Sequence, residues 1–155
     1  MKYPDILETP VVPCVKFKKL RDDATIPTRA TDGSAGFDLT ATSVCCKNRI
    51  NTYGTGIAVQ IPKNHVGLLF MRSSVAEKDI KLANAVGVID ADFRGEILLK
   101  FKYEDLAEYK HTIDTYQLGD RIGQLVVLPC LTQGIEAEEL DSTDRGSGGF
   151  GSTGR

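Results

Sequence analysis

Residues that commonly hold metal ions are scarce in this sequence. It has four cysteines, Cys14, Cys45, Cys46 and Cys130, but only two histidines, and no two cysteines have the spacing C-x-x-C. This composition gives little support to a metal centre built on cysteine and histidine. We expect instead reduced thiols, buried or half-buried, in an intracellular protein.

Long apolar runs and an excess of one charge are also missing. No segment approaches the ~20 apolar residues that span a membrane, and the first residues, MKYPDILETP, lack the apolar stretch of a signal peptide. The 19 basic and 21 acidic residues give a net charge of −2, so no overall field attracts nucleic acid or an anionic membrane. We expect a soluble cytoplasmic protein, or a nuclear one if the host has a nucleus, that binds neither.

Helical periodicity is rare, whereas strand-like alternation recurs through the first two-thirds of the chain. A length of 155 residues with 41% hydrophobic residues suits a single domain with its own core. Apolar residues alternate with others over 15–17, 57–61 and 66–70, between segments rich in turn formers. This pattern predicts an all-β fold, either a sandwich, a jelly roll or a barrel.

One short helix is expected after Ser74. Ser74 and Glu77 have the spacing of a capping box, in which each side chain bonds a free backbone N–H at the start of a helix. A second segment, from Tyr103 to Lys110, has mixed charges and is interpreted as a solvated face or an inserted loop. The run from Ile122 to Pro129 predicts a buried strand that proline ends.

The stretch 84–101, NAVGVIDADFRGEILLKF, predicts a β-hairpin with its turn at residues 90–95. In its second strand, alternation places Ile97, Leu99 and Phe101 on the core face and Leu98 and Lys100 on the other. Asp90 comes directly after two apolar residues, where partial desolvation would suit a carboxylate to act as a general base. The alternative that Asp90 only caps the turn stays open at this point.

Residues 141–155, DSTDRGSGGFGSTGR, cannot pack a core because Phe150 is their only apolar side chain. The glycines satisfy G-x-G-x-x-G, but no strand precedes them and no lysine follows, which excludes a dinucleotide fold and a phosphate loop. Arg145 offers a charge for a phosphate, the backbone amides offer donors, and Phe150 offers a face for a base. We expect a terminus that is mobile unless something holds it, and both a floppy end and a segment that contacts a nucleotide stay open at this point.

Five short motifs, numbered 1 to 5 in chain order, combine glycine with polar or charged residues. They are Ala35–Leu39 (AGFDL), Arg72–Ser74 (RSS), Gly87–Glu96 (GVIDADFRGE), Gly119–Leu125 (GDRIGQL) and Arg145–Gly154 (RGSGGFGSTG). In this order and at these spacings they resemble the five motifs of the trimeric dUTP diphosphatases (dUTPases). The resemblance covers most of the chain and is specific because all five motifs are present.

The resemblance implies hydrolysis of dUTP to dUMP and pyrophosphate, which lowers dUTP and supplies dUMP for thymidylate synthesis. It implies a jelly-roll-like β subunit, residues 1–140, that forms a homotrimer, and a glycine-rich arm, residues 141–155, that closes over the active site. Each active site would be shared: one subunit gives motifs 1, 2 and 4, a neighbour gives motif 3, and the third gives motif 5. By this resemblance Asp90 activates the attacking water, and Asp38 holds Mg²⁺ through water.

The resemblance also assigns contacts with the nucleotide. Phosphate contacts fall to Arg72, Ser73, Ser74 and Gln124, with Arg145, Gly151, Ser152 and Thr153 from the arm. The uracil slot takes Asn84, Gly87, Val88 and Leu98, and Phe150 stacks on the base. Ile89 is a further nucleotide-binding residue. Phe93 lies against the deoxyribose, where the family usually has tyrosine, so a hydrogen bond from the phenol is lost. Arg72 also has a possible role in the subunit interface, and Asp120 and Arg121 are expected to support the fold.

Three other functions are weighed against this one. A deoxycytidine triphosphate deaminase of the same broad fold would need a general-base glutamate at the base-reading site, whereas motif 3 follows the dUTPase pattern. A nucleotide-binding regulator would bind dUTP, turn it over slowly and use a surface such as the segment 103–118 to control a protein partner. A purely structural jelly-roll subunit would bind no nucleotide.

Overall fold

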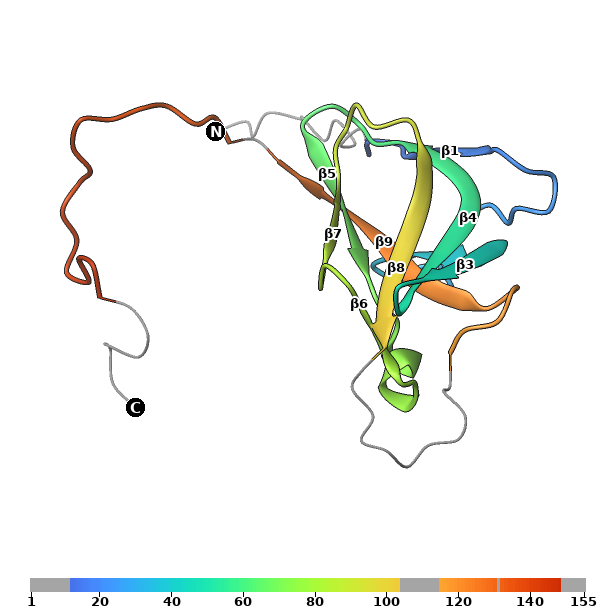
Figure 1. The fold of residues 1–155 in the computed structure, drawn as a ribbon. Coiled ribbons are helices and arrows are strands. Elements are labelled where there is room, and N and C mark those ends of the chain that lie inside the picture. The colour runs from blue at the N-terminus through green and yellow to red at the C-terminus, as the bar shows by residue number, and fades with distance from the viewer. Residues whose placement is uncertain (1–11, 104–114, 131, 149–155) are drawn as a thin grey trace, which may run out of the picture.

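The computed structural model describes residues 12–103, 115–130 and 132–148 of the chain (Figure 1). These residues form strands and one short 3₁₀ helix, as the alternation predicted. The elements are β1 (Lys16–Lys19), β2 (Phe37–Thr40), β3 (Ser43–Lys47), β4 (Ile50–Gln60), β5 (His65–Phe70), η1 (Ser73–Glu77), β6 (Ile80–Leu82), β7 (Gly87–Ile89), β8 (Glu96–Tyr103) and β9 (Arg121–Pro129).

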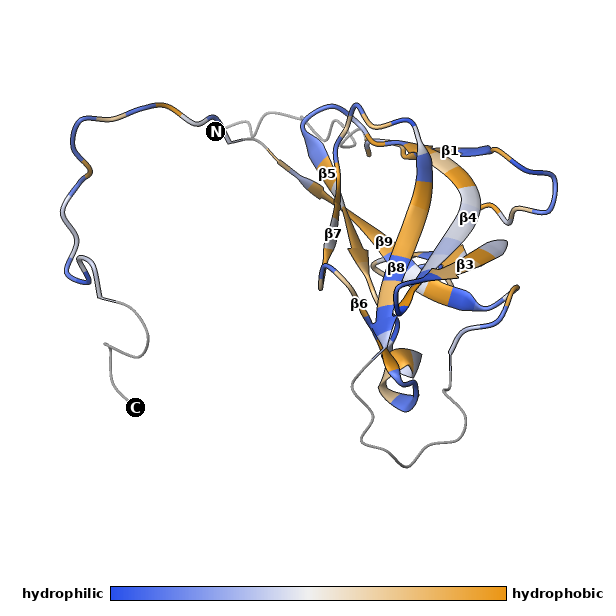
Figure 2. Cartoon of the chain, in the orientation of Figure 1, coloured by the Kyte–Doolittle hydropathy of each residue, from blue (hydrophilic) through white to orange (hydrophobic). Residues whose placement is uncertain are grey.

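The strands form two antiparallel sheets, which confirms the jelly-roll-like prediction. The first sheet has the order β1-β4-β8-β6, with β3 also paired to β4, and the second has the order β2-β9-β5-β7. Hydrophobic residues concentrate in these strands, whereas the loops and much of the chain after β9 are hydrophilic (Figure 2). The apolar faces of both sheets therefore bury one another, which is the main stabilising contribution to a sandwich.

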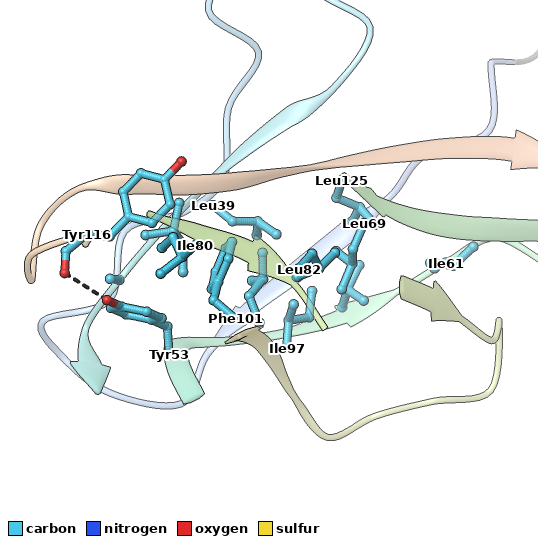
Figure 3. Close-up of a cluster of buried hydrophobic side chains, with 14 residues drawn as sticks. Leu39, Tyr53, Ile61, Leu69, Ile80, Leu82, Ile97, Phe101, Tyr116 and Leu125 are labelled. Atoms are coloured by element: carbon cyan, nitrogen blue, oxygen red, sulfur yellow. Dashed lines mark hydrogen bonds between the residues drawn. The ribbon is translucent and has the colours of Figure 1, made fainter. Parts of the chain in front are cut away.

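The core contains the face of β8 that the alternation predicted. Ile97, Leu99 and Phe101 are at most 1% exposed, while Leu98 lies on the other face and is 44% exposed. The rings of Phe101 and Tyr53 meet edge to face, with their centroids 5.7 Å apart (Figure 3). Edge-to-face pairs of this kind add stability beyond the apolar area that they bury.

We predict that Tyr53→Phe lowers the free energy of unfolding by about 1–2 kcal/mol. The buried Tyr53 hydroxyl donates a hydrogen bond of 2.8 Å to the backbone carbonyl of Tyr116 and so joins β4 to the segment before β9 (Figure 3). Phenylalanine keeps the ring contacts but leaves that carbonyl without its donor. Urea denaturation of both proteins measures the difference, and equal stabilities would show that the bond contributes nothing.

The predicted hairpin over residues 84–101 is wrong. Its first strand, β7, pairs with β5 in the second sheet, and its second strand, β8, pairs with β4 and β6 in the first. The connecting residues 90–95 cross from one sheet to the other and contain a turn, in which the Phe93 N–H donates to the Asp90 carbonyl at 3.1 Å. Strand β8 gains partners on both sides by this arrangement, which a two-stranded hairpin would not provide.

The predicted capping box is also wrong. The short helix starts two residues earlier, its N-cap residue is Arg72, and no side-chain hydrogen bond caps it. The Ser74 hydroxyl instead lies 3.4 Å from the Tyr116 hydroxyl. A 3₁₀ segment of this length leaves its first N–H groups without partners inside the helix.

The four cysteines are exposed, so the expectation of buried or half-buried thiols is wrong for the single subunit. Cys45 and Cys46 lie on β3, which pairs with β4 and is mostly exposed along its length. The Cys46 sulfur lies 3.7 Å from the Tyr103 hydroxyl, and this hydrogen bond together with partial burial raises the pKa of Tyr103. The thiols are free, as the sequence predicted.

After β9, residues 132–148 run away from the sheets and are almost entirely exposed (Figure 1). The hydrogen bonds described there are local: the Gly146 N–H donates to the Thr143 carbonyl, and the Arg145 Nε donates to the Gly148 carbonyl at 3.0 Å. Phe150, Gly151, Ser152 and Thr153 lie outside the described residues, as does nearly all of the predicted loop 103–110. In the part of the chain that the structure describes, no helix is long and apolar enough to cross a membrane.

Candidate active site

Motifs 1, 2 and 4 meet at one cavity of about 180 Å³, which we call the Asp38 pocket. Its lining residues are Ala30, Ser34, Gly36, Asp38, Arg72, Ser73 and Gln124. Asp38 on β2 is directly opposite Gln124 on β9, and residues in register across an antiparallel pair point to the same face. Four predicted site residues from three separate segments are thereby brought together.

Gly36 keeps this pocket open. A Cβ atom at this position would lie 2.8 Å from the Gln124 Oε1 atom and 3.1 Å from the Gln124 Cβ atom. The Gln124 amide nitrogen donates to the Met71 carbonyl at 3.3 Å, which ties β9 to the chain just before motif 2. A side chain at position 36 would therefore displace Gln124 from the wall of the pocket.

The carboxylate of Asp38 is held by two arginines. Arg72 Nε donates to Oδ1 at 3.1 Å, and Arg121 NH1 donates to Oδ2 at 2.9 Å. The Asp38 and Arg72 side chains are 16% and 27% exposed, so their ion pair is shielded from solvent better than an ordinary surface pair, whereas the Arg121 side chain is 53% exposed. The three groups carry a net charge of +1, which favours an anion in the adjoining pocket.

Asp120 and Arg121, in motif 4, make different kinds of contact. Asp120 lies in the turn before β9, where its carboxylate accepts the Gln117 N–H at 2.7 Å. Arg121 contacts a predicted site residue directly, as described above, rather than only supporting the fold. Ser74 does not line the Asp38 pocket; it lines a neighbouring cavity of about 370 Å³ with Tyr116 and Arg121, which we call the Tyr116 pocket.

A separate cavity of about 340 Å³, the Leu98 pocket, contains three of the residues predicted to read the base. Its lining residues are Leu69, Leu82, Ala83, Asn84, Gly87, Leu98 and Lys100. It lies where β6, at the edge of the first sheet, approaches β7, at the edge of the second. Leu69, Leu82 and Lys100 were not predicted, because alternation marks such residues only as core or surface positions.

The remaining residues of motif 3 line neither pocket. Asp90 is exposed, so the predicted partial desolvation of its carboxylate is wrong for the single subunit. Val88 is 63% exposed and Phe93 is 39% exposed. The Phe93 ring lies against Gly95, where an added Cβ atom would approach the ring to 2.7 Å. Ile89 packs partly against the core.

The two pockets share no lining residue. One subunit therefore has a pocket suited to an anion and, at a different place, an apolar slot. Asp90 lines neither of them. Arg145, which was predicted to complete the site, lies on the exposed segment after β9. In the single subunit, the predicted site residues are therefore distributed over two pockets, the exposed Asp90 and the exposed segment after β9.

The residues at Asp38 suit a metal held through water better than a metal bound directly. Within residues 12–103, 115–130 and 132–148, no group of three or more histidine, cysteine, aspartate or glutamate side chains could hold a metal ion. A carboxylate has about four lone-pair positions, and the two arginines use one on each oxygen of Asp38. Acceptor capacity remains for water molecules of a hydrated Mg²⁺, which usually keeps several waters.

Comparison with known proteins gives a consistent result. A family model described as dUTPase matches residues 22–154. The deoxyuridine 5'-triphosphate nucleotidohydrolase of Corynebacterium glutamicum is 42% identical over 145 residues, which cover 91% of this chain and 95% of that protein. The protein of the same name from Tropheryma whipplei strain Twist is 42% identical over 133 residues, covering 83% and 88%.

Solved structures of phage dUTPases share the fold. The dUTPase of Staphylococcus bacteriophage 80alpha with dUpNHpp has a TM-score of 0.75 at 29% identity, covering 93% of this chain and all of that one. A mutant dUTPase of S. aureus phage phi11, described as revealing the coordination of a structural Mg(II) ion, has a TM-score of 0.67 at 26% identity, covering 81% and 97%. The chain belongs to the dUTPase family, and it is a dUTP nucleotidohydrolase.

Proposed function

We propose that three copies of the chain form shared active sites that hydrolyse dUTP to dUMP and pyrophosphate by attack of water on the α-phosphorus. The main observation in support of a shared site is that the Asp38 pocket and the Leu98 pocket are separate and have no lining residue in common. The family supplies the reaction, and this separation supports the need for a second copy. The β domain 1–140 then holds both pockets, and the arm 141–155 of the third copy closes the site.

The triphosphate is assigned to the Asp38 pocket. Arg72 and Ser73 line it, and the arginine–carboxylate group described above carries a net positive charge. Gln124 offers an uncharged contact on the same wall, suited to the α-phosphate. From the arm, Arg145 supplies a further charge, and the amides of Gly151, Ser152 and Thr153 supply donors that strengthen as charge develops on the leaving pyrophosphate. Ser74 supports this wall through its contact with Tyr116.

The uracil is assigned to the Leu98 pocket of a neighbouring copy. Gly87 and Asn84 offer main-chain and amide groups that can match the donor and acceptor pattern of uracil, and Leu98 provides an apolar wall. A Cβ atom at Gly87 would come 3.0 Å from the Leu69 side chain, so the strand there approaches its neighbour closely. A site that hydrogen-bonds its ligand can discriminate by ~10⁴ to 10⁵ against analogues that leave its groups unpaired. Val88 and Ile89 complete this strand, and Phe150 stacks on the base.

Asp90 is the general base in this proposal. It accepts a proton from water while that water attacks the α-phosphorus, and the bond from the α-phosphorus to the bridging oxygen of pyrophosphate breaks. The exposed position of Asp90 at the end of β7 allows it to enter a site formed with another copy. Phe93 excludes a 2′-hydroxyl by lying flat on the deoxyribose.

A magnesium ion on the triphosphate would be held by Asp38 through water. When bound, Mg²⁺ neutralises charge on the phosphate oxygens. Asp38 itself orients the water molecules that it contacts, and its two arginines hold its carboxylate in place. The role of the reaction is to lower dUTP and to supply dUMP for thymidylate synthesis.

We predict that Leu98→Ala raises the KM for dUTP roughly tenfold and leaves kcat within about twofold, because it removes apolar contact with the base and no reacting group. Leu128→Ala is the matched control. Leu128 is 45% exposed, close to the 44% of Leu98, but it lines neither pocket. Steady-state kinetics of both variants give the comparison, and an equal effect at the two positions would remove Leu98 from the base slot.

The test of the proposed function is pyrophosphate release from dUTP and from each of the four common deoxynucleoside triphosphates. Release from dUTP in preference to dTTP and dCTP by at least ~10³-fold is expected for a hydrogen-bonding slot. Ammonia release from dCTP would instead support the deaminase alternative. Tight binding of dUTP with a kcat well below ~1 s⁻¹ would support a regulator. One observation favours the regulator as a second candidate function: structures of the 80alpha phage dUTPase are described as showing control of virulence-gene transfer by phage dUTPases.

A further inference from the structure

Strand β9 contains an irregularity beside Asp38. Its register with β2 pairs Leu39 with Gly123 and then Thr40 with Arg121, so Ile122 is an extra residue on β9. An extra residue in one strand of an antiparallel pair is a β-bulge, and bulges next to active sites often turn a side chain to a new direction. The direction in question here is that of Arg121.

The bulge reverses the faces of two residues. Leu125 is fully buried, and a Cβ atom at Gly123, two residues earlier, would clash with a Leu99 methyl group, so both positions face the core. Continued alternation would point Arg121 into the core and Ile122 outward. In the structure Ile122 is fully buried and the Arg121 side chain is 53% exposed.

The Arg121 side chain, turned outward by the bulge, contacts Asp38 but does not line the Asp38 pocket. Its NH1 atom lies 2.9 Å from Asp38 Oδ2, while Arg72 binds Oδ1. Asp38 and Arg72 line the Asp38 pocket, whereas Arg121 lines the Tyr116 pocket and not the Asp38 pocket. Arg121 is therefore placed to act on a ligand in the Asp38 pocket through Asp38.

We propose that Arg121 is a positioning residue, aimed by the β9 bulge, that fixes the carboxylate of Asp38 for the waters of a magnesium-bound triphosphate. This inference rests on the proposed function. With both arginines in place, each carboxylate oxygen keeps a lone pair for the pocket side. Without Arg121, Asp38 is free to turn and form a two-bond pair with Arg72, which withdraws both groups from the pocket.

The test uses dUpNHpp, an analogue with an imido bridge, and the full-length chain. Titration calorimetry gives the Kd of dUpNHpp with and without Mg²⁺, and the ratio of the two values is the factor by which the metal tightens binding. Arg121→Gln is expected to reduce this factor 10- to 100-fold, the usual cost of losing a residue that orients a metal-site ligand. Because the factor is a ratio, any loss of metal-free binding caused by the missing positive charge cancels from it. Arg121→Lys should recover most of it, because an ammonium can still donate to Oδ2. Arg21→Gln is the control, since Arg21 pairs with Asp23 at 2.8 Å outside both pockets.

A double-mutant cycle separates a positioning role from a general structural one. If Arg121 acts through Asp38, the double variant with Asp38→Asn and Arg121→Gln should lose no more magnesium dependence than Asp38→Asn alone. The positioning role would be overturned if the loss of magnesium dependence in the double variant equalled the product of the losses in the two single variants. An unchanged magnesium factor in Arg121→Gln would also overturn it. Failure of the wild-type chain to bind dUpNHpp or to release pyrophosphate from dUTP would instead overturn the proposed function.

Discussion

Asp90→Asn is expected to lower kcat for dUTP by roughly 10²- to 10⁴-fold, the range for losing a general base. The asparagine amide has nearly the size of the carboxylate but does not take up a proton from the attacking water. Binding of dUpNHpp should therefore persist. The stability should also persist, within about 0.5 kcal/mol, because Asp90 is exposed and substitutions at such positions cost little. Single-turnover kinetics and analogue titration measure the two effects separately.

Asp92→Asn is the matched control for this experiment. Asp92 is two residues further along the same connection, is exposed like Asp90, and its substitution changes the net charge by the same amount. Its variant should keep turnover within about threefold of the wild type, since exposed charges away from the reacting atoms contribute little. Retained turnover in Asp90→Asn, or an equal loss in Asp92→Asn, would remove Asp90 as the base.

Truncation after Leu140 is expected to lower kcat/KM for dUTP by at least about 10²-fold and to change the melting temperature by less than about 2 °C. Activity falls because the arm supplies the Arg145 charge, the amides and the aromatic ring that close the site. Stability is kept because the described residues 141–148 are nearly all exposed and their hydrogen bonds are local. Differential scanning calorimetry and a pyrophosphate assay give the two values.

Single substitutions in the arm refine this result. Arg145→Gln should reproduce part of the loss through weaker binding of the triphosphate, whereas Asp144→Asn, at the neighbouring exposed position, should stay close to the wild type. A truncated chain with full activity would contradict the role of the arm as a lid. A large fall in its melting temperature would show that the arm belongs to the folded core.

The sequence predicted strands better than it predicted their partners. Alternation located β8 and its buried face, because the period of two directly reflects which side chains meet the core. It did not show that β7 joins β5 while β8 joins β4 and β6, because local periodicity carries no information on pairing between distant strands. The exposure of Cys45 and Cys46 was missed for a related reason: cysteine is usually buried, but β3 pairs with β4 alone among the described strands.

Prediction of the site followed the same division. Motif residues such as Asp38, Arg72 and Gln124 were found because their local sequences are distinctive, and the fold brings them to one pocket. Leu69 and Leu82 join the Leu98 pocket only through the arrangement of strands distant in the sequence, so no local pattern marks them. The contact of Arg121 with Asp38 depends on one extra residue in β9, and a shift of one residue exchanges the faces of a strand.

The most direct test of the shared active site is a mixing experiment with two inactive proteins. The Asp90→Asn chain supplies an intact arm, and the chain truncated after Leu140 supplies an intact Asp90. After subunit exchange, confirmed by mass spectrometry of differently labelled chains, mixed trimers should release pyrophosphate from dUTP at a substantial fraction of the wild-type rate. Complete exchange with no recovered activity, or full activity from a monomeric wild-type chain, would contradict the account.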